Sequence, residues 1–159
     1  KTELLGSVHD PTAALMGGIA GHAGLFSTAE DLAKMCQMYL NKGEYGGERY
    51  LTAATVETFT DRNDCFANNR RGLGFDKPEP DTTKVSPVCK QSSLNSYGHT
   101  GFTGIIAWCD PDNELIYIFM SNRTYPNEFD NKLVKESFRT KIQEAIYNGL
   151  GINCRKQVN

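Results

Sequence analysis

The residues best suited to chemistry lie in the stretch YGHTGFTGIIAWCD, which runs from Tyr97 to Asp110. Each glycine in a strand costs backbone entropy, so three of them beside an apolar run indicate that something approaches the backbone closely. His99 can donate or accept a hydrogen bond, and Thr100 carries a hydroxyl. Gly101 leaves room for a substrate against the strand. The backbone N–H of Phe102 is a candidate oxyanion donor.

Metal and cofactor chemistry finds little support. The chain has three histidines, of which His22 and His99 lie among glycines. Neither an H-x-x-x-H nor an H-E-x-x-H pattern is present, so further metal ligands are missing. The five cysteines are scattered, with no C-x-x-C pair, which favours buried free thiols over a zinc site. No metal and no cofactor are predicted.

Motifs for an activated serine are also absent. There is no G-x-S-x-G and no S-x-x-K, since Ser86 and Lys90 are one residue too far apart. Two formal Y-x-N matches, Tyr39–Asn41 and Tyr125–Asn127, fall at an expected helix end and an expected turn. They are interpreted as accidental.

Size and charge narrow the class of protein. The chain has 159 residues and a formal net charge of -2, with acids and bases intermixed. It is the size of one domain, and its charge gives no reason to expect nucleic acid or an acidic membrane surface. The longest strongly apolar stretch, Leu115–Met120, is too short to cross a bilayer. No signal peptide is recognisable, so the chain is expected to begin mid-protein or after processing.

The first half of the chain predicts two helices. After a glycine-rich loop over residues 1–26, Ser27 and Glu30 form a capping-box pattern for a helix that ends near Asn41. GEYGGERYL predicts a turn or short hairpin, and Thr52 caps a shorter helix. The polar stretch over residues 62–95 predicts a long loop or a small irregular subdomain, in which RGLGF is a candidate short strand.

The second half predicts a hairpin and a helix. Tyr97–Thr100 is expected to start a strand that continues through Ile105–Cys109, and DPDN turns the chain into Leu115–Ser121. A helix is expected from Asp130, packed on the sheet through a stripe of Val134, Phe138 and Ile142. The fold class is therefore α+β, with an antiparallel sheet flanked by helices.

GHTGFTGIIAWCDPDNELIYIFMSNRTYP resembles the last strands of class C serine β-lactamases and their penicillin-binding relatives. In that family a Lys-Thr-Gly or His-Thr-Gly triplet opens a strand on the active-site edge, and a short loop and two-strand tail follow. AGLFSTAEDLAKM is similar to the family's helix start after the pocket-lining loop. The resemblance covers roughly residues 18–150 and implies a partial β-lactamase/transpeptidase-like fold.

The resemblance assigns roles to the glycine-flanked residues. His99 takes the place of the basic residue that binds the substrate carboxylate and tunes proton transfer. Thr100 takes the place of the hydroxyl that bonds substrate, Gly101 keeps the strand open, and Phe102 supplies one oxyanion N–H. His22 and Ala23 fall in the pocket-lining loop. A lysine at position 99 would stay charged, whereas a histidine titrates near neutrality.

The family's nucleophile, the serine of Ser-x-x-Lys, has no match here. The resemblance therefore implies that residues 1–159 are the C-terminal portion of a single serine hydrolase domain, inactive alone. It implies a small-molecule or peptide substrate, the missing N-terminal part as partner, and the bacterial periplasm or envelope as location. Self-association is an alternative cover for the open sheet edge. The alternative function is a non-catalytic binding or structural module of a larger cell-wall enzyme.

Overall fold

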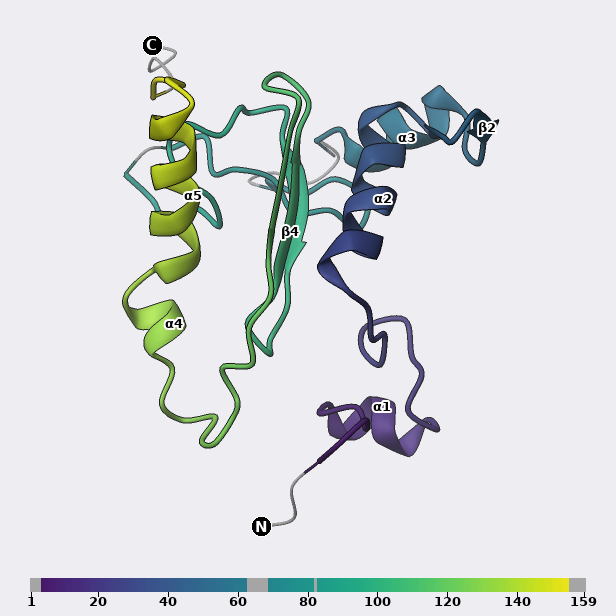
Figure 1. Cartoon of the computed structure of the whole chain (residues 1–159), viewed down its shortest axis with the longest axis vertical. Helices are drawn as coiled ribbons and strands as arrows, with labels where there is room; N and C mark the ends of the chain where they lie inside the picture. Colours follow the sequence, from purple (N-terminus) through teal and green to yellow (C-terminus); the bar gives the residue numbers. More distant parts are fainter. Residues whose placement is uncertain (1–3, 63–68, 82, 155–159) are drawn as a thin grey trace.

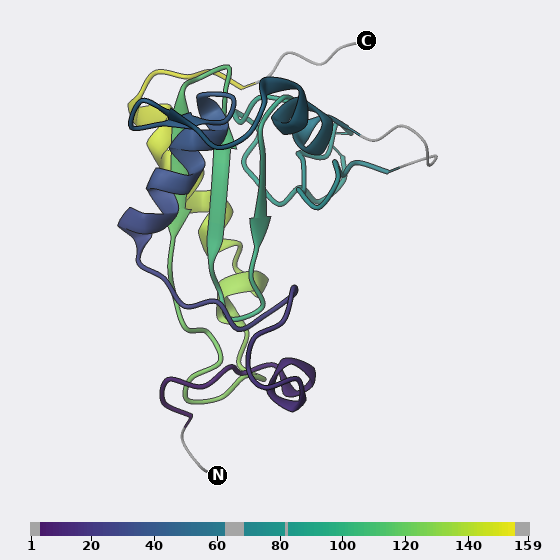
Figure 2. The ribbon, with the colours of Figure 1, turned by 90° about the vertical axis from the view of Figure 1, so that its right-hand side faces the viewer.

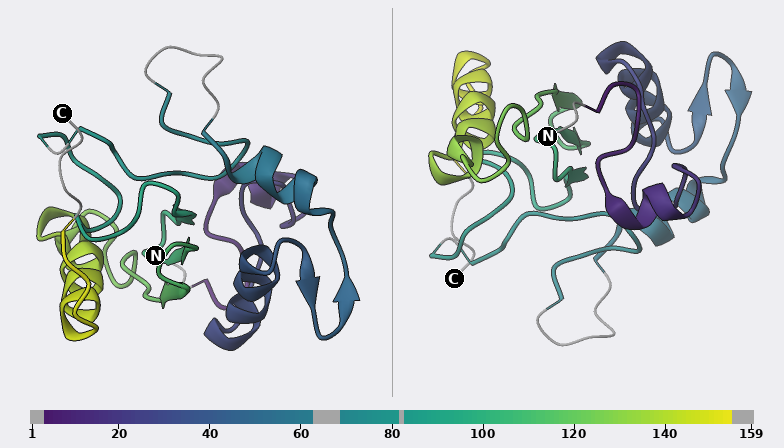
Figure 3. Two further views of the ribbon diagram at one scale, coloured as in Figure 1. Left: turned by 90° about the horizontal axis from the view of Figure 1, so that it is seen from above. Right: turned by 90° about the horizontal axis from the view of Figure 1, so that it is seen from below.

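A three-stranded sheet lies at the centre of the molecule, with helices on both of its faces (Figure 1). The computed structural model describes residues 4–62, 69–81 and 83–154. Helix α2 (Ala29–Leu40) covers one face, and α5 (Phe138–Gly149) lies on the other. Views from above and below show the sheet between the two helices (Figure 3). The predicted α+β class, an antiparallel sheet flanked by helices, is confirmed.

The strand order is β3 (Tyr97–Thr100), β4 (Ile106–Asp110), β5 (Leu115–Phe119), and both pairings are antiparallel. The expected hairpin of β4 and β5 is confirmed. The expectation that Tyr97–Thr100 runs on into the next strand is wrong, because the chain reverses after Gly101. The N–H of Gly101 bonds the carbonyl of Ile105 at 2.8 Å, and Gly104 has a φ of 114° that favours glycine.

Gly98 is required by close packing between β3 and β4. A Cβ at this position would lie 2.2 Å from the carbonyl oxygen of Ala107 and 2.6 Å from the indole of Trp108. Trp108 belongs to the apolar cluster on the α5 face, whose buried members are Val88, Ile106, Trp108 and Tyr117. The α2 face has its own buried cluster of Cys36, Tyr97 and Cys109. Both faces of β3 and β4 are therefore covered.

The elements before the sheet follow the sequence closely. The cap of α2 is Thr28, one residue after the expected Ser27, and its hydroxyl accepts the N–H of Asp31. Thr52 caps α3 (Ala53–Thr60) as predicted. The expected hairpin forms from β1 (Glu44–Tyr45) and β2 (Glu48–Arg49).

The C-terminal helix differs from the prediction in two ways. It is split into α4 (Lys132–Lys135) and α5, because Ser137 adopts a left-handed φ of 54°. The face of α5 that is buried carries Gln143 and Tyr147, whereas the predicted stripe of Val134, Phe138 and Ile142 is exposed. That packing prediction is wrong, because the loop and strand end beneath α5 present polar groups. Gln143 accepts the N–H of Cys89 at 2.9 Å, and the Tyr147 hydroxyl donates to Asp110 at 2.7 Å.

The glycine-rich N-terminal segment lies below the sheet (Figure 2). It was expected to be loop but includes a short helix, α1 (Pro11–Leu15), whose N-terminus is capped by Asp10. Of the cysteines, Cys36, Cys89 and Cys109 are buried free thiols as expected, whereas Cys154 is exposed and Cys65 lies outside the described residues. In the part of the chain described, no helix is long and apolar enough to cross a membrane.

Candidate active site

The outer edge of β3 is paired at Gly98 and unpaired at Thr100, the next residue whose backbone groups face outward. Gly98 exchanges two backbone hydrogen bonds with Asp76, at 2.8 and 3.0 Å. Alternate residues of an antiparallel strand face the same side, so the backbone groups of Thr100 also point away from β4. Within the described ranges no strand pairs with Thr100 on that side. The edge is therefore closed at Gly98 and open from Thr100 onward.

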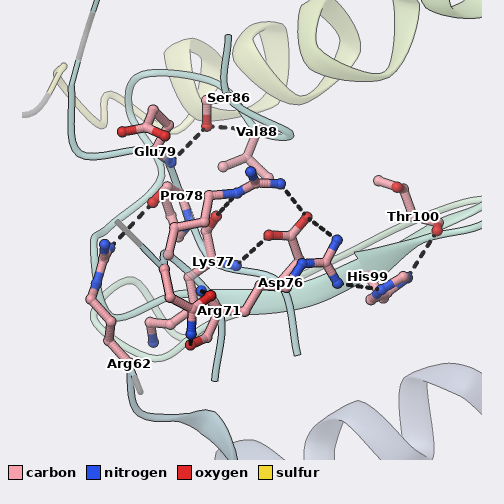
Figure 4. Close-up of polar contacts among 12 residues, drawn as sticks. Arg62, Arg71, Asp76, Lys77, Pro78, Glu79, Ser86, Val88, His99 and Thr100 are labelled. Atoms are coloured by element: carbon pink, nitrogen blue, oxygen red, sulfur yellow. Dashed lines mark hydrogen bonds and ion pairs between the residues drawn. The ribbon is translucent and has the colours of Figure 1, made fainter. Parts of the chain in front are cut away.

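His99 is exposed beside this open edge, and both of its ring nitrogens have partners (Figure 4). Nε2 lies 3.0 Å from Nη1 of Arg71, and Nδ1 lies 2.9 Å from the carbonyl oxygen of Thr100. The guanidinium of Arg71 also lies 3.6 Å from the buried carboxylate of Asp76. That carboxylate forms a closer ion pair with Arg70, at 2.8 Å. The histidine is thus held in one orientation by a cluster of charges.

The turn after β3 presents the backbone of Phe102. The guanidinium of Arg123 lies 4.0 Å from the centre of the Phe102 ring, and its Nε donates to the Phe102 carbonyl. On the other side the ring stacks on His9, with 5.5 Å between ring centres. Among the described residues no acceptor pairs with the Phe102 N–H. This N–H is therefore held beside the open edge and available to a ligand.

His22 and Ala23 lie in the N-terminal segment and not against β3. The Nε2 of His22 is 3.0 Å from the carboxylate of Asp10, and the carbonyl of Ala23 accepts the N–H of Ala20. The bond from His22 and the N–H of Ala13 lower the pKa of Asp10, with the Ala13 bond the larger cause. No hydrogen bond, ion pair or ring contact in the described structure joins His22 to β3. His9 is the histidine of this segment that reaches the candidate site.

A buried lysine lies close to the other end of β3. The ammonium of Lys77 donates to the carbonyls of Thr60 and Asn95 and sits 5.8 Å from the ring centre of Tyr97. Burial lowers the pKa of this lysine. Through these two carbonyls, Lys77 ties the loop before β3 to the end of α3.

No serine of the described part is hydrogen bonded to a histidine. Ser92, Ser93 and Ser96 are buried in a network in which Ser96 receives the indole N–H of Trp108 at 3.0 Å. The hydroxyls of Ser92 and Ser96 bond each other, and that of Ser96 also donates to the Ser93 carbonyl, so these contacts hold the loop before β3. Among the described residues, no group of three or more histidine, cysteine, aspartate or glutamate side chains is placed to hold a metal ion.

Sequence reasoning found the triplet but missed its partners. Arg71, Asp76 and Arg123 gave no recognisable motif, because they approach His99 and Phe102 only through the folding of distant segments. The one available signal was the short RGLGF stretch, which places Arg71 directly before a glycine turn.

Comparison with known proteins decides the family. The family model described as Beta-lactamase matches residues 3–138 of the chain. The chain belongs to the beta-lactamase family. The recognised His-Thr-Gly strand and its two-strand tail are therefore those of a beta-lactamase-related hydrolase.

Two similar proteins, from Salmonella paratyphi B and Salmonella newport, are named "Putative D-alanyl-D-alanine carboxypeptidase". Each is 34% identical over 157 residues, an alignment that covers 92% of this chain and 36% of the relative. A crystal structure of a beta-lactamase from Mycobacterium bovis is similar in fold, with a TM-score of 0.59 and 19% identity. That similarity covers 80% of this chain and 46% of the other. This member of the beta-lactamase family thus spans about a third of the length of the relatives it matches.

Proposed function

We propose that residues 1–159 form the C-terminal, substrate-binding wall of a serine acyl hydrolase that acts on peptidoglycan peptides ending in D-alanine. The nucleophilic serine comes from the part of the same fold that this chain does not contain. The observation that carries the proposal is the edge of β3, which is closed at Gly98 and open from Thr100. The relatives named as carboxypeptidases support the substrate class.

The open edge suits an extended acyl substrate. Main-chain groups of a strand edge bind a peptide by adding it as a further strand. Here Thr100 supplies its outward N–H and a hydroxyl, while its carbonyl is bonded to His99, and Phe102 supplies an N–H with no acceptor of its own in the described structure. As the serine oxygen attacks the carbonyl carbon, negative charge develops on the carbonyl oxygen, and the Phe102 N–H stabilises it. His99 lies beside the same groups, where it contacts the substrate end and the proton network.

Exposed apolar side chains support the proposal that another part of the fold packs against this chain. In the N-terminal segment the exposed fractions of Leu5, Leu15 and Leu25 are 91%, 90% and 84%. Large apolar side chains exposed to this extent within one segment indicate that other protein packs there. The relatives and the solved beta-lactamase extend well beyond the matched region. The remaining part of that fold is the occupant we propose, and the bacterial cell envelope is the proposed location.

Covalent labelling of the full-length protein tests this function. The full-length protein and residues 1–159 are each incubated with a fluorescent penicillin and with a peptide ending in D-Ala-D-Ala. We expect the full-length protein to release D-alanine and to form an acyl adduct, which mass spectrometry places on a serine outside these 159 residues. We expect residues 1–159 alone to do neither.

Two outcomes contradict the proposal. An adduct on a serine of this chain would show that the nucleophile was misassigned. A full-length protein that neither forms an adduct nor turns over peptide, ester or cephalosporin would favour a non-catalytic binding or structural module.

A further inference from the structure

The backbone next to Arg71 is fixed in a position from which the side chain contacts His99 on β3. It precedes Gly72, where a Cβ would lie 2.5 Å from the carbonyl oxygen of Phe59 and 2.7 Å from that of Asp61. The N–H of Leu73 also bonds the Phe59 carbonyl, at 3.0 Å. This tight turn fixes the backbone beside Arg71 against the end of α3. The guanidinium then extends to His99 (Figure 4), and its Nη1 lies 3.0 Å from the Nε2 of His99.

The contacts of His99 determine which ring nitrogen carries the proton. A guanidinium has only donors, so the Nε2 of His99 must accept from Arg71. The carbonyl of Thr100 has only acceptor sites, so Nδ1 must donate to it. Both contacts are satisfied by one form of the ring, the neutral Nδ1–H tautomer. Arg71 thereby excludes the tautomer with the proton on Nε2.

Among the described residues, the same cluster has an excess of positive charge at the open edge. Arg70 and Arg71 share the single carboxylate of Asp76, and two positive charges less one negative leave one positive charge. Arg70 makes the shorter contact, 2.8 Å against 3.6 Å, so Asp76 is satisfied without Arg71. The side chain of Arg71 is 47% exposed and is accessible to a ligand.

We propose that Arg71 positions His99 as the Nδ1–H tautomer and supplies the permanent cation of this site. This cation selects acyl substrates whose leaving residue ends in a free carboxylate beside Thr100. Arginine stays charged at every working pH and binds carboxylates with two parallel N–H groups, which a neutral histidine cannot do. The inference rests on the proposed function for its substrate class, and it assigns recognition to a residue outside the His-Thr-Gly triplet.

The first test reads the ring of His99 directly. The full-length protein is labelled with ¹⁵N at histidine, and the two ring nitrogens of His99 are observed by NMR at a pH where the ring is neutral. We expect a protonated, pyrrole-like Nδ1 and an unprotonated, pyridine-like Nε2. Arg71→Ala should convert both signals to the averaged values of mixed tautomers. Arg62→Ala is the matched control, because Arg62 donates to the carbonyl of Pro78 and does not touch His99.

The second test measures selection without requiring turnover. Dissociation constants of N-acetyl-D-alanine and its methyl ester are measured by NMR titration. We expect the wild type and Arg62→Ala to prefer the free acid. Arg71→Ala should reduce that preference about tenfold, which corresponds to loss of one charge-assisted contact. Arg71→Lys should restore part of the preference, since it keeps the charge but loses the paired N–H groups.

Failure of this inference is distinct from failure of the proposed function. An unchanged tautomer in Arg71→Ala, or an unchanged preference for the free acid, would overturn the role of Arg71 whether or not the protein turns over substrate. An Arg71-dependent preference in a protein that forms no acyl adduct would support the role of Arg71 and count against the hydrolase.

Discussion

Strand β3 has only four residues, but its first two and its last two differ sharply in burial and in pairing. Tyr97 and Gly98 are buried, and Gly98 is bonded on its outer side to Asp76. His99 is exposed and Thr100 is half-buried, with no strand beside them on that edge within the described ranges. One half belongs to the core, and the other carries the side chains that we propose to act on substrate.

This difference shows how a small strand can position exposed functional groups. The core around Trp108 and the pairing with Asp76 fix the first half. Because the strand backbone is continuous, the second half is then positioned without being buried itself. The exposed residues are therefore free to serve binding. Substitutions in the first half should act on stability, and substitutions in the second should act on activity.

Gly98→Ala should give the largest effect and unfold the buried half. The new Cβ would lie 2.2 Å from a backbone oxygen, so the strands must separate. We expect a loss of about 3 kcal/mol or more in the free energy of unfolding, measured by urea denaturation of the full-length protein. Gly149→Ala is the control, since a Cβ there meets nothing within 4 Å. Equal stability of the two variants would refute the close packing at Gly98.

His99→Ala should leave stability unchanged and reduce activity. We expect kcat/KM of the full-length protein to fall by roughly 10- to 1,000-fold, about 1.4–4 kcal/mol, because the group beside the substrate end is lost. His99→Lys should retain part of the activity, since it restores the family's alternative residue. If His99→Gln and His99→Ala both keep wild-type kcat/KM, the residue only fills space beside the strand.

Asp110→Asn should weaken, in a pH-dependent way, the contacts that join the end of β4 to α5 and to the loop before β3. Burial raises the pKa of Asp110, but hydrogen bonds from Ser93, Tyr147 and Asn113 outweigh it and hold the pKa below the ordinary value. A carboxyl with a lowered folded-state pKa stabilises the protein above its unfolded pKa, and that contribution is lost as the pH falls through the folded pKa.

We therefore expect Asp110→Asn to cost about 1.5–3 kcal/mol at pH 7, the range for hydrogen bonds to a charged group. The difference from wild type should shrink below about pH 4, where the unfolded carboxyl takes up its proton. Urea denaturation at several pH values measures both. A difference that stays constant with pH would show that the charge of Asp110 contributes nothing.

Thr100→Val should give the smallest effect on activity, and it tests what the hydroxyl in the exposed half contributes. The substitution keeps the shape of the side chain and removes its hydroxyl. Loss of one hydrogen bond to substrate should lower kcat/KM about fivefold to tenfold, roughly 1 kcal/mol, with little change in stability. Thr100→Ser keeps the hydroxyl and should stay near wild type. Equal losses in both variants would assign the effect to packing.

Local patterns determined much of the fold. Capping residues and helical spacing were enough for α2 and α3, and the DPDN turn was enough for the β4–β5 hairpin. The His-Thr-Gly strand with its two-strand tail was enough for the family. These features depend on residues close in sequence, whose physics is the same in any surroundings.

The errors arose where a distant segment decided the outcome. The apolar stripe of α5 faces outward because buried polar groups claim Gln143 and Tyr147. The chain reverses after Gly101, although continuation as one strand has the same hydrophobic pattern. The assignment of His22 to the pocket-lining loop stays a prediction; in the described structure its partner is Asp10.

By itself, then, the sequence determined the family and the antiparallel hairpin, and it singled out the triplet His99–Gly101 as the proposed chemical centre. Only the tertiary structure decided that Asp76 closes the edge at Gly98, that Arg71 fixes the ring of His99, and that Arg123 and His9 hold Phe102. Each of these partners is more than twenty residues from the group it contacts. Contacts of that kind leave no local pattern, because they depend on how separate elements pack and not on the residues beside them.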